Sequence, residues 1–262
     1  MQKRGQLTIF VILGLIILLV ALATVFLIEN TQKTELTAIE GDLQIPAIKN
    51  FIQTCIKTTT QDAIFANGLR GGYYNLPELS TITYNDNLPY YKYKQNNYLP
   101  SIDELSKQLG LYLDDNLNNC FDNFASFVEQ GYDFELGEIE SSPSINQDNL
   151  DLIVKVPLKI NLADKTATIG KVQSSIQLLE VLETLNFAKE LIATEEDGYI
   201  CINCLEVESI TYDILEDIDG HYVIQLSNHD LVYNNNPYML NFAIQYQDNE
   251  PDGSEIYETI EI

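Results

Sequence analysis

An uninterrupted apolar run near the N-terminus constrains this chain more than any other feature. Residues 7–28, LTIFVILGLIILLVALATVFLI, contain no charged side chain. At about 1.5 Å per residue, a helix of this length spans the hydrocarbon core of a bilayer, which is about 30 Å thick. The chain after residue 28 mixes polar and apolar residues, as water-soluble domains do. The sequence therefore predicts one transmembrane helix at residues 7–28 that carries a soluble domain.

The charges that flank this run predict its orientation. Lys3 and Arg4 precede it, whereas Glu29 and Glu35 follow it. Basic residues beside a transmembrane helix stay on the cytoplasmic side. We therefore expect residues 1–6 to form a basic cytoplasmic head and the domain to lie outside the cell membrane. A cleaved secretory signal peptide is the alternative, but its apolar region is usually about 7–15 residues long and ends at small residues.

A short basic motif, Lys3-Arg4-Gly5-Gln6, stands directly before the apolar run. It resembles the class III signal of archaeal type IV pilin-like proteins. In that family a peptidase cuts after the glycine on the cytoplasmic side and leaves the apolar helix on the mature protein. The resemblance implies that Gly5 is the last residue removed and that Gln6 becomes the new N-terminus. Phe10 departs from the bacterial pattern, which has glutamate there, and a signal anchor that is never cut is the alternative.

Composition limits the partners of the chain. Its 14 basic and 39 acidic residues give a net charge of −25. Such a surface repels nucleic acid, whose binding needs Lys and Arg to displace counterions from phosphate. It favours solubility outside a cell and disfavours lying flat on anionic lipid. We expect membrane attachment through residues 7–28, no nucleic-acid partner, and self-assembly or contacts with other surface proteins.

Four cysteines follow the apolar run: Cys55, Cys120, Cys201 and Cys204. An even number of cysteines outside a cell favours disulfides, and four cysteines allow three pairings. We favour Cys55–Cys120 with Cys201–Cys204, because the first two lie on separate predicted helices. The C-x-x-C motif of the second pair also invites a redox or a zinc interpretation. Redox motifs usually start a helix in a thioredoxin-like setting, and four-cysteine zinc sites usually contain two close pairs.

The part after the apolar run divides into three segments. Residues 29–45 are polar and threonine-rich, and we expect a juxtamembrane stalk there. Residues 46–131 place apolar side chains at helical spacing, whereas residues 132–262 mostly alternate apolar and polar side chains, as half-buried strands do. A further amphipathic helix is predicted at residues 177–195. The expected fold class is α+β, with amphipathic helices and an antiparallel sheet.

Local signals place the ends of several elements. Pro46 is typical of the first turn of a helix, and Gly68 of its end. Ser101 and Glu104 form a capping box at the start of a second helix. Pro157 interrupts an alternating run and predicts a bulge or an edge strand.

A tyrosine-rich segment, residues 69–100, separates these two helices. Its prolines exclude a long helix and favour short edge strands or an ordered loop. Residues 87–102 contain no acidic side chain and carry Lys92 and Lys94. The tyrosines either form a platform for a glycan or a partner, because tyrosine gives large contact area at small entropic cost, or pack the segment onto the core. The platform would comprise Tyr73, Tyr74, Tyr90, Tyr91, Tyr93 and Tyr98.

The chain contains three further short motifs: Gly68-Leu69-Arg70-Gly71-Gly72-Tyr73, Asn97-Tyr98-Leu99-Pro100-Ser101 and Cys201-Ile202-Asn203-Cys204-Leu205. Together they resemble a family of uncharacterised single-anchor surface proteins predicted in small-genome archaea. The likeness covers the anchor and most of the domain. It implies a compartment and an architecture, and it carries no known activity.

The sequence contains no complete catalytic or metal-binding motif. His221 and His229 lack the H-E-x-x-H pattern of zinc hydrolases, and no G-x-S-x-G, P-loop or G-x-G-x-x-G motif is present. Acidic turns at residues 216–220 and 248–253 concentrate oxygen atoms as calcium ligands do. Neither matches an EF-hand loop, and their Asp-Gly pairs also form hairpin turns. We predict no catalytic, cofactor-binding or metal-binding residue, with calcium at these turns as the alternative.

These features favour a single-pass cell-surface structural or interaction protein that is not an enzyme. It would be a type IV pilin-like subunit or a tethered module for adhesion or envelope assembly. The alternative is a membrane-tethered extracytoplasmic enzyme or ligand-binding protein. Removal of the head after Gly5 would favour a filament, and an intact Met1 would favour a lone anchor.

Overall fold

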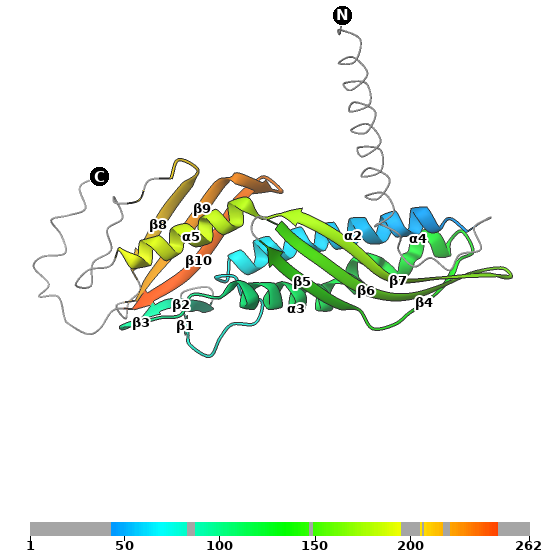
Figure 1. Ribbon diagram of the computed structural model, residues 1–262, viewed down its shortest axis with the longest axis horizontal. Coiled ribbons are helices and arrows are strands. Elements are labelled where there is room, and N and C mark those ends of the chain that lie inside the picture. Colours follow the sequence, from blue (N-terminus) through cyan, green and yellow to red (C-terminus); the bar gives the residue numbers. More distant parts are fainter. Residues whose placement is uncertain are drawn as a thin grey trace, which may run out of the picture.

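The computed structural model describes residues 43–82, 87–146, 149–194, 205, 207–216 and 221–245. These residues form an α+β fold in which two sheets pack against helices (Figure 1). The predicted head, transmembrane helix and most of the stalk, residues 1–42, lie outside them. The helices of the described part are each too short or too polar to cross a bilayer.

Two long helices begin where the sequence predicts. α2 (Ile45–Gly68) carries a proline in its first turn and buries an apolar stripe at helical spacing. α3 (Ile102–Phe121) starts at Ser101, whose hydroxyl accepts a hydrogen bond from the Glu104 N–H at 3.1 Å. This interaction satisfies one of the unpaired N–H groups of the first turn. The short helix α4 (Ala125–Val128) follows α3 after a tight turn.

The first sheet is antiparallel throughout. β6 (Asn149–Leu162) lies at its centre and alternates strictly between buried and exposed residues. β7 (Lys165–Gln177) pairs along one side of β6, and β4 (Asp133–Leu136) and β5 (Glu140–Asn146) pair along the other. The pairing register of β6 and β7 shifts between Lys155 and Leu158, which confirms a bulge at Pro157.

The second sheet is mixed, which corrects the expectation of antiparallel pairing alone. Its strands lie in the order β1-β2-β10-β9-β8, with β3 also paired to β2. β2 and β10 run parallel, and the other neighbours run antiparallel. β2 and β10 are far apart in sequence, and a parallel pair needs such a long connection. The strands are β1 (Ser80–Ile82), β2 (Asn87–Tyr93), β3 (Asn96–Asn97), β8 (Ile210–Glu216), β9 (Tyr222–Tyr233) and β10 (Asn236–Gln245).

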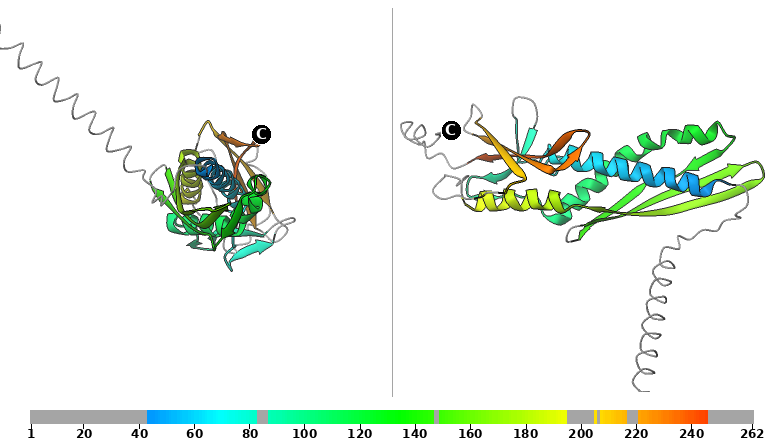
Figure 2. Two further views of the ribbon diagram at one scale, coloured as in Figure 1. Left: turned by 90° about the vertical axis from the view of Figure 1, so that its right-hand side faces the viewer. Right: turned by 90° about the horizontal axis from the view of Figure 1, so that it is seen from above.

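α2 joins the two halves of an elongated molecule (Figure 2). Its N-terminal part packs with α3 onto the antiparallel sheet, and its C-terminal part reaches the core beneath the mixed sheet. α5 (Leu179–Ala193), within the predicted residues 177–195, packs on β9. The described chain therefore starts at the end that carries the β6–β7 hairpin, and the mixed sheet lies at the opposite end (Figure 1).

Gly68 permits the close approach of α2 to β10, so its replacement by alanine is expected to be costly. A Cβ atom there would lie 2.4 Å from the Met239 carbonyl oxygen, which is backbone and cannot rotate away. We expect Gly68→Ala to lower the free energy of unfolding by about 3 kcal/mol. Urea denaturation followed by circular dichroism measures this, because the chain has no tryptophan. Gly170→Ala is the control, because its Cβ would meet nothing within 4 Å. Equal losses of unfolding free energy in both variants would show that the close approach of α2 to β10 does not require Gly68.

Candidate functional site

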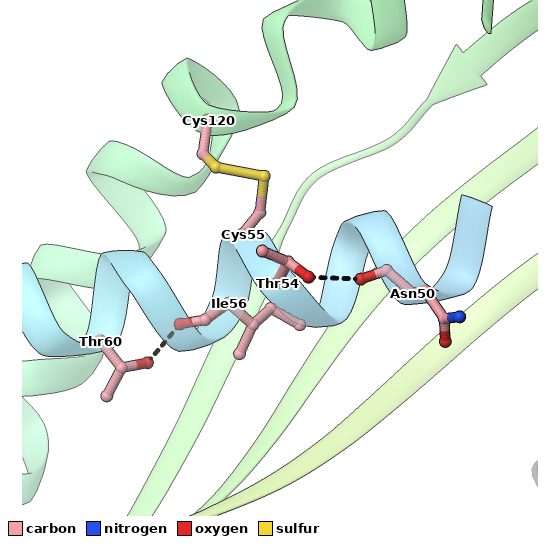
Figure 3. Close-up of a disulfide and its surroundings, with 6 residues drawn as sticks. All are labelled: Asn50, Thr54, Cys55, Ile56, Thr60 and Cys120. Atoms are coloured by element: carbon pink, nitrogen blue, oxygen red, sulfur yellow. Dashed lines mark hydrogen bonds between the residues drawn. A yellow bond between two sulfur atoms is a disulfide. The ribbon is translucent and has the colours of Figure 1, made fainter. Parts of the chain in front are cut away.

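A disulfide links the two long helices. Cys55 of α2 bonds to Cys120 of α3, with the two Cα atoms 5.6 Å apart and a sequence separation of 65 (Figure 3). Cys55 faces the core, as its place in the helical stripe predicts. The structure thus confirms the pairing of Cys55 with Cys120. Cys201, Cys204, Gly5 and Gln6 lie outside the described residues.

The predicted tyrosine platform is wrong for three of its six members. Tyr73, Tyr90 and Tyr91 are buried. For Tyr90 and Tyr91 the reason is the position of β2, which lies inside the mixed sheet between β10 and the short strands β1 and β3. Residues 88–92 are all buried, so both faces of this strand are covered as well. The alternative interpretation, in which tyrosines pack the segment onto the core, holds for these three.

Tyr91 is the most deeply buried of these three tyrosines. Its ring stacks on Phe242 with centroids 4.3 Å apart, and its hydroxyl donates a hydrogen bond to the Gly71 carbonyl oxygen at 3.1 Å. Burial raises the pKa of the phenol well above its usual value. Tyr91 is therefore a neutral core residue.

The other three tyrosines lie nearer to the surface. Tyr74 and Tyr93 are half-buried, and Tyr98 is 43% exposed. The Tyr74 hydroxyl donates to an Asp115 carboxylate oxygen at 2.9 Å, which raises the pKa of that phenol. The six side chains therefore do not form one continuous platform.

A different feature is the strongest candidate site: an open cleft of about 720 Å³ between α5 and the β8–β9 hairpin. One wall is the outer face of α5, where Glu183, Asn186 and Glu190 recur at helical spacing and lie exposed. The apolar side of the same helix faces the core. The amphipathic pattern of residues 179–193 therefore presents two carboxylates to the cleft.

The other wall comes from residues 207–210, which lead into β8, and from the second half of β9. It carries Glu208, Ser209, His229 and Asp230. The His229 N–H donates to the Ser209 carbonyl oxygen at 2.9 Å, which holds the two strands together at this point. The His229 Nε2 lies 2.9 Å from the Thr211 hydroxyl, so the imidazole is fixed against β8.

Asn228 fastens the two walls to each other beneath the cleft. It is fully buried, and its amide donates to the Glu180 carbonyl oxygen and to the Thr184 hydroxyl, both at 3.1 Å. Its side-chain oxygen accepts a hydrogen bond from the Asp230 N–H at 3.0 Å. The Asn228 side chain thereby links β9 to α5 and holds the backbone of Asp230 in place.

Replacing Asn228 by leucine is expected to lower the free energy of unfolding by about 2 kcal/mol. The variant keeps a similar size but removes the Asn228 amide from the Asp230 N–H and from its two acceptors on α5. Urea denaturation checks this value. Asn186→Leu, exposed on the α5 wall, is the control and should change stability by less than about 0.5 kcal/mol. A loss of stability at Asn228 as small as that at Asn186 would show that the hydrogen bonds of Asn228 do not stabilise the fold.

The cleft is suited to attracting positive charge. Its lining contains four carboxylates, on Glu183, Glu190, Glu208 and Asp230, and neither lysine nor arginine among the described lining residues. Within the described part of the chain, no three Asp, Glu, His or Cys side chains come close enough together to hold a metal ion. The four carboxylates therefore suit a cationic group.

The sequence pattern singles out His229 as one of two histidines but does not connect it with Glu183 and Glu190. Glu183 and Glu190 have a helical spacing in the sequence. Acidic residues are so frequent in this chain, however, that this spacing alone does not identify a binding site. Most of the first predicted calcium turn and all of the second, residues 217–220 and 248–253, lie outside the described residues.

Comparison with protein-family models, with curated proteins and with solved structures gave no significant match to this chain.

Proposed function

We propose that this chain is a single-pass, membrane-anchored cell-surface protein that acts through structural contacts with other proteins. The observation that carries the proposal is the Cys55–Cys120 disulfide in a domain that follows an apolar run of 22 residues. Disulfides persist in oxidising surroundings and are rare in the cytosol. Together with the basic residues before the run, this supports an N-terminus inside the cell and a domain outside it.

The arrangement of the domain supports an exposed role for the mixed sheet. α2 begins near the end of the molecule that carries the β6–β7 hairpin and leads from there to the mixed sheet (Figure 1). A helix of 24 residues is about 36 Å long. An anchor before residue 43 therefore favours a mixed sheet directed away from the membrane, where partners meet it first.

Two forms of this function differ in the fate of the head. Cleavage between Gly5 and Gln6 would produce a type IV pilin-like subunit whose apolar helix packs into a filament. An intact Met1 would leave a permanent anchor for an adhesion or envelope module. The alternative, an extracytoplasmic enzyme or ligand-binding protein, would place its ligand in the acidic cleft, and a cationic ligand suits that lining.

Carbonate extraction of native membranes tests the anchor. We expect the full chain to stay in the membrane pellet at alkaline pH, and a variant lacking residues 7–28 to appear in the soluble fraction. Mass spectrometry of the N-terminal peptide then separates the two forms, since it begins at Gln6 after processing and at Met1 without it. Release of the full chain by carbonate would overturn the proposal.

A further inference from the structure

We propose that copies of this chain associate head to tail through the two opposite edges of the mixed sheet. The β8 edge of one copy, residues 210–216, would pair with the β3 edge of the next copy, residues 94–98. This inference rests on the proposed function, which calls for contacts at the cell surface, and it names a second copy as the partner.

The β8 edge has the properties of an unsatisfied sheet edge. β8 is the last strand of the mixed sheet, and within the described part of the chain its outer side has no strand partner. Tyr212, Ile214 and Leu215 are 37%, 36% and 59% exposed. An edge strand with free backbone groups and apolar side chains is a template for pairing with another chain.

The β3 edge lies at the other end of the same sheet. β3 pairs with β2 on one side, and residues 94–98 are all exposed, including Lys94 and the large ring of Tyr98. The Lys94 ammonium lies 5.5 Å from the centre of the Tyr93 ring, where it remains available to solvent. Tyrosine is enriched at protein contact surfaces.

The charges of the two edges are complementary. Asp213 is exposed on β8, and Glu208 is exposed just before this strand begins, whereas residues 87–102 contain no acidic side chain and carry Lys94 at the turn. In a chain with a net charge of −25, this acid-free edge is the exception. Complementary charges select a partner and its register. A symmetric contact between two β8 edges would instead bring carboxylates together, which disfavours it.

The strand directions fit such a contact. β8 runs antiparallel to β9, β9 to β10, and β10 parallel to β2, which is antiparallel to β3. β8 and β3 therefore run in opposite directions, and a neighbouring copy in the same orientation presents β3 antiparallel to β8. A contact between two different surfaces leaves both outer edges free, so it repeats and generates an open array.

Photo-crosslinking of the full chain in vesicles tests the contact. Tyr98→p-benzoylphenylalanine places the reactive group on the β3 edge, and isotope-labelled and unlabelled copies are reconstituted together. We expect a crosslinked peptide pair that joins residue 98 of one copy to residues 207–216 of a differently labelled copy. Crosslinks confined to one copy, crosslinks to another surface, or none at all would overturn the proposal. External protease applied to the same vesicles reports the anchoring and exposure of the domain separately.

Variants that reverse one charge on either side of the contact provide a second test. Lys94→Glu and Asp213→Lys should each lower the yield of this crosslink by about tenfold, because each replaces attraction by repulsion. Mixing the two variants should restore the yield, because each junction then pairs opposite charges again. The controls Lys57→Glu on α2 and Asp164→Lys at the β6–β7 turn change the net charge equally, far from both edges. Equal losses in the controls, or no restoration on mixing, would overturn the proposal.

Discussion

Replacing Cys55 and Cys120 together by alanine is expected to lower the free energy of unfolding by about 4 kcal/mol. The disulfide closes a loop of 65 residues, and the chain-entropy model predicts this stabilisation for a loop of that length. The bridge also joins α2 to α3 at the point where both helices pack on the antiparallel sheet. Urea denaturation of the full chain in mild detergent, followed by circular dichroism, measures the loss.

The single variants control this experiment. Cys55→Ala alone and Cys120→Ala alone each remove the bridge, so each should cost nearly as much as the double variant. Such strong non-additivity is the signature of two residues that act as a unit. Single variants with small losses that add up to the double variant would show that packing, and not the covalent link, provides the stability.

Replacing Tyr91 by alanine is expected to cost about 4 kcal/mol, because the variant removes a ring from the centre of the mixed-sheet core. Tyr91 is 0% exposed and stacks on Phe242, and its loss also leaves the Gly71 carbonyl without its hydroxyl donor. The same denaturation experiment measures the effect.

Tyr98→Ala is the matched control, since it removes the same side chain from the exposed edge of the same segment. We expect a change of less than about 0.5 kcal/mol there. Similar losses at both positions would mean that the tyrosines of residues 69–100 share one environment, which would contradict the division into core and edge residues.

The elements that the sequence located correctly have strong local signals. The Pro46 turn, the Ser101 cap and the alternation of residues 150–162 each depend on neighbours within one turn or one strand. β5 has a weak local signal, because Pro143 and three serines give its sequence little strand propensity. Its pairing along the edge of β6 tolerates a proline.

The burial of β2 depends on contacts that no local pattern contains. Its parallel partner β10 lies more than 140 residues later in the chain, so residues 88–92 could be read as an exposed aromatic surface. The acidic cleft has the same origin, because α5 and β9 bring Glu183 and Asp230 together only through the fold. Local signals therefore predict elements, and long-range pairing decides which side chains reach the surface.

The most direct test of the whole account is digestion of intact cells by an external protease. Because the proposed location of the domain is outside the membrane, the protease can reach it, and we expect a C-terminal epitope to disappear while a cytoplasmic control protein survives. Survival of the epitope in intact cells, together with its loss after lysis, would contradict the proposed location of the domain.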